Sequence, residues 1–209
     1  MKITTFEQSG LIITSENGQT LAIDIGALTP VASLTDTKVD NMLVSHIHAD
    51  HCSVEQIIAL QPQQVYTGTE CIEQLAESGV QTVEITDGVE VKIGDFSVTP
   101  FEVDHGPNAP RVPAQNFGFL IKIDGKLIYF AGDMFTPSGI TVNDIEADIV
   151  IVPVGGHFTL DAEAAFAFVQ QFKSIGLIYP VHHEAIGQID TNGHTKFAQL
   201  AEGIYEVVL

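Results

Sequence analysis

Cationic side chains are scarce in this chain. It has 8 lysines and arginines against 27 aspartates and glutamates, which gives a formal net charge of −19. Such a surface repels the phosphate backbone of nucleic acids and anionic lipid head groups. We therefore expect neither nucleic acid nor a membrane as a partner. The charge leaves the oligomeric state open, with a homo-oligomer among the options.

Cysteines and long apolar runs are also few. The two cysteines, Cys52 and Cys71, exclude a disulfide framework and are typical of a reducing compartment. The first seven residues lack the apolar core of a signal peptide. No apolar run approaches the roughly 20 residues that a membrane-spanning helix needs. These features predict a cytoplasmic protein.

Apolar residues make up 45% of the 209 residues, which is enough for a substantial core. No linker rich in proline, glycine or serine divides the chain, so we expect one domain over residues 1–209. Strands come in blocks, with helices between and after them, which favours an α/β (α+β) fold of mixed sheets covered by helices. The predicted strands are 2–6, 11–14, 21–25, 41–45, 82–85, 89–93, 96–103, 117–123, 127–130, 149–152 and 177–179. The predicted helices are 53–60, opened by a capping box at Ser53, 70–78, 160–172 and 196–201. Hairpin turns are expected at 86–88 and 124–125.

The segment after strand 41–45 concentrates metal-ligand side chains. It reads His-x-His-x-Asp-His and contains His46, His48, Asp50 and His51. Alternate side chains of an extended segment point the same way, so we expect His46 and His48 to bind the same ion. The chain then turns and presents Asp50 and His51 to a neighbouring position. Imidazole and carboxylate groups together are typical of a zinc site, and iron or manganese also accept them.

Three further residues of the same types follow predicted strands. His105 comes after strand 96–103, Asp133 after strand 127–130, and His182 after strand 177–179. Taken singly, each is equally compatible with a core-edge histidine or a capping aspartate. Together with the motif, they predict a metal centre at an edge of the sheets.

This order of residues resembles the metallo-β-lactamase superfamily, and the resemblance extends from Asp24 to His182. Within the superfamily, the segment 152–161 and the triplet 180–182 are similar to a branch of small metal-dependent hydrolases related to the L-ascorbate 6-phosphate lactonases. The branch often has glycine where Ile47 and Ala49 stand here. The resemblance implies a four-layer αββα sandwich with the site at one edge of two sheets.

The resemblance also implies two divalent metal ions, with Zn²⁺ expected first and Mn²⁺ or Fe²⁺ as alternatives. One ion would be held by His46, His48 and His105, and the other by Asp50, His51 and His182. Asp133 would bridge the two ions. Asp24 matches a position that supports the metal loop from behind the ligands.

A hydrolase is the activity that this assignment implies. Two metal ions lower the pKa of a shared water toward neutrality, and Asp50 would orient it and accept its proton. The expected substrate is a small ester, lactone or phosphate-bearing metabolite. The alternatives are a nuclease or phosphodiesterase of the same fold, a di-iron redox protein, and a non-catalytic metal-binding protein. The net charge of −19 weighs against the nuclease.

Three residues outside the metal set are further candidates. His157 lies in a Gly-Gly-His-Phe-Thr loop and is predicted to bind substrate or act as a general acid, or else to be structural. Arg111, the only arginine, follows His105 closely and is a candidate receptor for an anionic substrate, or else an ordinary loop charge. Adjacent residues of an extended segment face opposite ways, so only one of His182 and His183 should ligate. The resemblance favours His182.

Overall fold

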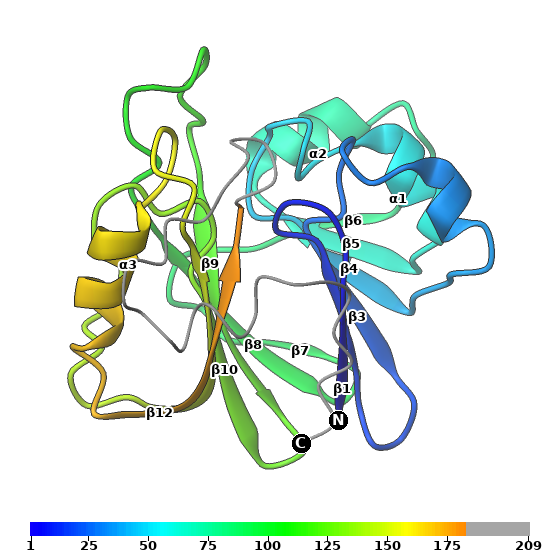
Figure 1. The fold of residues 1–209 in the computed structure, drawn as a ribbon. Helices are drawn as coiled ribbons and strands as arrows, with labels where there is room; N and C mark the ends of the chain where they lie inside the picture. The colour runs from blue at the N-terminus through cyan, green and yellow to red at the C-terminus, as the bar shows by residue number, and fades with distance from the viewer. Residues whose placement is uncertain (183–209) are drawn as a thin grey trace.

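Two six-stranded sheets form the centre of the computed structural model, which describes residues 1–182 (Figure 1). The predicted helix 196–201 and His183 lie outside the described residues. None of the helices within residues 1–182 has the length and apolar composition that crossing a membrane requires. In chain order the elements are β1 (Lys2–Thr5), β2 (Leu11–Thr14), β3 (Thr20–Ile23), η1 (Val31–Leu34), β4 (Asn41–Leu43), α1 (Val54–Leu60), β5 (Gln64–Thr67), α2 (Thr69–Leu75), β6 (Thr82–Glu84), β7 (Val91–Ile93), β8 (Phe96–Glu102), β9 (Phe117–Ile123), β10 (Lys126–Phe130), β11 (Glu146–Pro153), α3 (Ala162–Val169) and β12 (Ser174–Val181).

Each sheet combines antiparallel and parallel pairing. The first sheet has the order β1-β2-β3-β4-β5-β6, antiparallel up to β3 and parallel beyond it. The second has the order β7-β8-β9-β10-β11-β12, antiparallel up to β10 and parallel beyond it. Parallel neighbours need a crossover connection, and α1, α2 and α3 supply three of these. The predicted turn at 124–125 is confirmed: Asp124 and Gly125 both have positive φ between antiparallel β9 and β10.

The layers follow from where the apolar side chains are buried. Side chains such as Leu21 and Phe119 fill the space between the two sheets. Ile57 of α1 and Leu75 of α2 pack on the outer face of the first sheet, whereas Phe168 of α3 packs on that of the second. In Figure 1 the two groups of helices lie on opposite flanks. The expected four-layer αββα sandwich of the metallo-β-lactamase fold is therefore confirmed.

The predicted hairpin at 86–88 is wrong. β6 lies at the edge of the first sheet and β7 at the edge of the second, so this turn crosses between sheets. It is held by β8, because the backbone N–H of Gly88 donates to the carbonyl of Pro100 at 2.9 Å and Asp87 accepts from the N–H of Glu102 at 2.9 Å. Turn chemistry predicts that the chain reverses, but the partner of each strand is decided by distant segments.

Two other local predictions differ from the structure. Strand β5 was not predicted, because its residues show neither alternation nor an apolar run. Helix α1 does begin after Ser53, but the capping box is wrong: Ser53 caps no backbone N–H and hydrogen-bonds the side chain of Gln56. The Gln56 amide in turn donates to the carbonyl of Thr29 at 3.0 Å. A contact from another loop thus competes successfully with the local cap.

Candidate metal centre

All seven predicted ligand residues lie at the ends of strands along one edge of the two sheets. His46, His48, Asp50 and His51 occupy the loop between β4 and α1. The other three follow the ends of β8, β10 and β12; they are His105, Asp133 and His182. Strand ends suit this role because the sheets fix the backbone while the loops leave side chains free to converge.

The first loop packs against the segment that follows β3. The N–H of Ala27 donates to the carbonyl of Ala49 at 2.7 Å. A Cβ atom on Gly26 would lie 2.1 Å from the backbone carbonyl carbon of Asp50, so only glycine permits this approach. The close backbone contact fixes where Asp50 and His51 present their side chains.

The carboxylate of Asp133 lies at the centre of the cluster. Its Oδ2 atom is 3.1 Å from Nε2 of His182 and 3.2 Å from Nε2 of His51. The same oxygen is 3.8 Å from Nε2 of His105 and 3.9 Å from Nε2 of His46. Asp133 therefore faces four imidazoles with one oxygen atom, which is the placement that a bridging carboxylate needs.

The donor atoms form overlapping groups of three in which all ligand atoms lie within 4.8 Å of one another. One group is His46, His48 and His105; another is Asp50, His51 and His182; a third is His46, His51 and Asp133. The first two are the sets that the resemblance implies for two separate ions. The third connects them through Asp133.

Several donor atoms of this cluster are buried without a hydrogen-bond partner among the described residues. They are Nε2 of His51, both ring nitrogens of His105, Oδ1 of Asp133 and Nδ1 of His182. A buried polar atom without a partner costs about 1–3 kcal/mol. Ligand atoms 2.0–2.1 Å from a tetrahedral ion lie about 3.3 Å apart, and the separations from Asp133 bracket that value. The residues present therefore fit divalent metal ions.

Asp24, at the end of β3, orients two of the histidines. Its carboxylate is fully buried and accepts hydrogen bonds from Nδ1 of His51 at 2.9 Å and from Oγ of Ser45 at 2.6 Å. The Ser45 hydroxyl donates its proton to Asp24, so the Ser45 oxygen is left to accept from Nδ1 of His46 at 2.9 Å. Both imidazoles thus carry their proton on Nδ1 and turn Nε2 toward the cluster, which is what ligand-supporting residues do.

His48 is oriented from the opposite side. Its Nε2 lies 2.7 Å from the backbone carbonyl oxygen of Arg111. A carbonyl only accepts, so Nε2 carries the proton and Nδ1 is left bare. Nδ1 lies 2.9 Å from Nε2 of His46, on the side of the cluster.

The charges of the cluster are strongly coupled. Burial disfavours the charged form of His182, but Asp133 outweighs it and raises the pKa of His182 to about 9. Burial likewise opposes charge on Asp133, yet His182 and His51 hold its pKa well below the usual value. Burial, followed by the charge of His51, lowers the pKa of His46 and keeps that imidazole neutral. Neutral imidazole and ionised carboxylate are the forms that bind metal.

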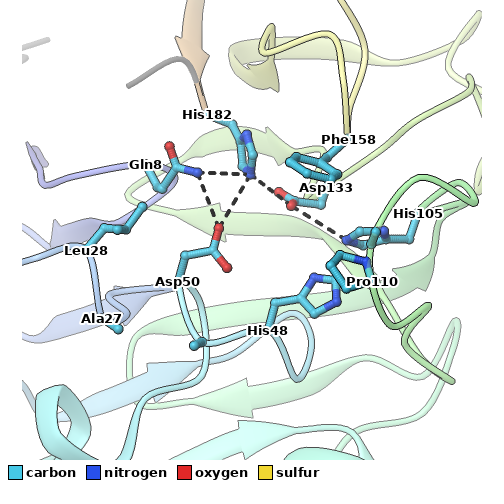
Figure 2. Close-up of a pocket in the computed structure, with 12 residues that line it drawn as sticks. Gln8, Ala27, Leu28, His48, Asp50, His105, Pro110, Asp133, Phe158 and His182 are labelled. Carbon is cyan, nitrogen blue, oxygen red and sulfur yellow. Dashed lines mark hydrogen bonds and ion pairs between the residues drawn. The ribbon is translucent and has the colours of Figure 1, made fainter. Parts of the chain in front are cut away.

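Gln8 belongs to the site but was not predicted. It sits in the turn between β1 and β2 with φ of 58°, and its Nε2 lies 3.3 Å from Oδ2 of Asp50 and 3.2 Å from Nε2 of His182. Its backbone carbonyl also accepts from the N–H of His182 at 3.1 Å. Figure 2 shows the three side chains meeting at one end of the cluster. A glutamine in a turn gives no recognisable signal in the sequence, so only the packing of β12 beside this turn identifies it.

The structure does not bring Arg111 and His157 into the cluster. The guanidinium of Arg111 is paired with Glu70, and its side chain is 63% exposed. His157 is exposed and its ring packs on Phe158, with ring centroids 4.5 Å apart. Neither residue is among those that line the pocket at the cluster, and their roles at the substrate stay predictions. Each loop instead contributes an apolar neighbour to the site, Pro110 and Phe158.

Known proteins are similar to this chain in sequence and in fold. A family model described as beta-lactamase superfamily domain matches residues 2–182. A UPF0173 metal-dependent hydrolase from Thermoplasma acidophilum is 31% identical over 192 residues, which cover 86% of this chain and 82% of the relative. One from Carboxydothermus hydrogenoformans is 28% identical over 192 residues, covering 88% and 84%.

A solved structure extends the likeness to the fold. Igni18, titled a novel metallo hydrolase from the hyperthermophilic archaeon Ignicoccus hospitalis, has a TM-score of 0.76 at 20% identity, covering all of this chain and 98% of that one. At 20% identity, this match supports a shared fold and nothing further. The family model and the sequence relatives go further: the chain belongs to the beta-lactamase superfamily and, within it, to the UPF0173 metal-dependent hydrolase family.

Proposed function

We propose that this protein is a metal-dependent hydrolase with two divalent ions, Zn²⁺ first among them, at the His/Asp cluster. The observation that carries the proposal is the set of imidazole and carboxylate donor atoms that lie within 4.8 Å of one another. Two of the buried ones, Nε2 of His51 and Nε2 of His105, have no hydrogen-bond partner among the described residues. Such a set is unfavourable as it stands and becomes favourable around cations. The names of the UPF0173 relatives agree with this reading.

The residues divide into candidate metal ligands and the residues that orient those ligands. His46, His48 and His105 would hold one ion, Asp50, His51 and His182 the other, and Asp133 would reach both. When bound, divalent ions supply Lewis acidity toward a substrate oxygen and lower the pKa of water toward neutrality. Asp24 and Ser45 keep Nε2 of His46 and Nε2 of His51 aimed at the centre.

Asp50 is the carboxylate that we propose for proton transfer. Its side chain is 26% exposed, whereas that of Asp133 is 2% exposed. Burial raises the pKa of Asp50, but the charge of His51 and the interaction with His182, whose Nε2 lies 3.6 Å from Oδ2 of Asp50, outweigh it and hold the pKa below its usual value. An ionised carboxylate open to the pocket can orient a water and accept its proton. The reaction would be hydrolysis of a small ester, lactone or phosphate-bearing metabolite, as in the lactonase-like branch that the sequence resembles.

The test combines elemental analysis with activity. We expect stoichiometric metal in the purified protein and in His157→Ala, which alters an exposed histidine outside the cluster. His48→Ala and Asp133→Ala should lose metal and activity on a panel of lactones, thioesters, phosphodiesters and sugar phosphates, run with zinc-loaded and manganese-loaded protein. Circular dichroism checks that each variant is folded. A wild-type protein without stoichiometric metal, and cluster variants that bind metal as wild type does, would overturn the proposal.

A further inference from the structure

A pocket of about 400 Å³ opens in front of the cluster. Its floor consists of the polar side chains described above, Gln8, His48, Asp50, His105, Asp133 and His182. Its walls come from four loops and are apolar: Ala27, Leu28, Ala49, Ala109, Pro110 and Phe158. Figure 2 shows Leu28 and Ala27 on one side of the cluster, with Phe158 and Pro110 on the other. The reacting group of a substrate would lie on the floor, and the remainder would contact the walls.

No lysine or arginine of residues 1–182 lines this pocket. Arg111 follows Pro110 directly, but its guanidinium pairs with Glu70. The second carboxylate oxygen of Glu70 accepts from the N–H of Ala114, so this ion pair is anchored to the loop backbone. A cation near in sequence is thus held away from the pocket.

An anionic group on the remote part of a substrate would therefore lie against carbon atoms with no countercharge from the described residues. Removing an anion from water without a partner is costly. The net charge of −19 opposes its approach as well. An apolar group in the same place would gain from contact with Leu28, Pro110 and Phe158.

We propose that the natural substrate is a neutral ester, thioester or lactone whose non-reacting part is a small uncharged hydrocarbon group, and not a phosphate-bearing metabolite. This inference rests on the proposed hydrolase function. It narrows the substrate classes named there and removes the anionic substrate that Arg111 alone suggests. A pocket of this size lies toward the small end of those that bind ligands, so a compact acyl group suffices to fill it.

The first test compares two matched esters with zinc-loaded protein. One is p-nitrophenyl hexanoate and the other is mono-p-nitrophenyl adipate, which carries a carboxylate at the far end of the same chain length. We expect kcat/KM to favour the neutral ester by about tenfold or more, because the carboxylate is desolvated without a partner. Across p-nitrophenyl acetate, butyrate and hexanoate, kcat/KM should rise by roughly fourfold per buried methylene.

A positive charge inserted into the wall should weaken this preference for the neutral ester. Leu28 is 48% exposed, so Leu28→Lys is expected to fold, and it should reduce the neutral-to-anionic ratio by about tenfold. Val89→Lys is the matched control, since Val89 is 57% exposed and does not line the pocket. The inference is overturned if the adipate ester is hydrolysed as well as the hexanoate ester, or if the two lysine variants behave alike.

A binding measurement separates this inference from the proposed function. Hexanamide and adipamate, its carboxylate counterpart, are not ester substrates and report binding through a rise in melting temperature. We expect hexanamide to stabilise the zinc-loaded protein more than adipamate. If no ester is hydrolysed but hexanamide still binds better, the hydrolase proposal fails and the assignment of the pocket stands. If neither amide binds, or adipamate binds as well, the assignment of the pocket fails.

Discussion

Oδ2 of Asp24 lies 2.9 Å from Nδ1 of His51, and both side chains are fully buried. The same carboxylate reaches His46 through the hydroxyl of Ser45. One acidic side chain therefore orients two candidate ligands assigned to different ions. Because Asp24 follows β3 directly, these hydrogen bonds connect the first sheet to the loop after β4.

Asp24→Asn should weaken metal binding by about 10–100-fold, because the amide holds the His46 and His51 tautomers less firmly. The measurement is competition for zinc with a chelator of known affinity. Asp95→Asn is the matched control, since Asp95 accepts from Ser15 and Asn17 at an exposed turn. Equal zinc affinity in the two variants would show that Asp24 has no supporting role.

Gln8→Leu should lower kcat by about tenfold while the protein keeps its metal, because the variant removes the amide that contacts Asp50 and His182 but no ligand atom. Kinetics and elemental analysis of the same preparation provide both readouts. Gln19→Leu changes a glutamine whose side-chain oxygen accepts from the N–H of Asp95, away from the cluster, and it should retain wild-type kcat. If the Gln8→Leu protein loses its metal, Gln8 is needed to assemble the metal centre, and the expectation of a lower kcat with the metal retained is contradicted.

The metal-free protein should become less stable as the pH rises from about 6.5 to about 9. The pKa of His182 is 6.5 when unperturbed and about 9 in the folded protein. The stabilisation from its protonated form is complete below pH 6.5 and is lost as the pH passes through 9, with a slope of at most about 1.4 kcal/mol per pH unit. Urea denaturation across this range measures it. A urea concentration at the unfolding midpoint that stays constant or rises between pH 6.5 and pH 9 would contradict the assignment of the proton to His182.

Tyr129→Phe should raise the free energy of unfolding by about 1 kcal/mol, because the buried hydroxyl of Tyr129 has no partner within residues 1–182. The aromatic contacts with Phe101 and Phe172 are retained. In the control, Tyr66→Phe, the hydroxyl that is lost donates to Gln64 at 2.7 Å, so stability should fall. Chemical denaturation gives both values, and the same sign for the two changes would refute the argument.

Much of the metal centre could be predicted because its signal is local. Each candidate ligand follows an apolar strand closely, and the end of that strand fixes the backbone position of the ligand. His46 and His48 are two residues apart in the loop after β4, and their ring centroids lie 4.6 Å apart.

Sequence reasoning could not foresee contacts whose partners are distant in the sequence. The guanidinium of Arg111 pairs with Glu70, which lies 41 residues earlier in the chain. The turn at 86–88 docks on β8 and separates β6 from β7. No local pattern encodes either partner, because each becomes a neighbour only after the sheets have formed.

The sequence by itself determined the kinds of ligand, their order, and the alternation of strands and helices that builds the sandwich. Only the tertiary structure decided that Gln8 contacts His182, that Asp24 serves two histidines, and that apolar walls surround a polar floor. Short-range propensities act between residues that are close along the chain. The character of the pocket depends on which loops the packing of two sheets brings to a shared edge, and that packing is a property of the whole core.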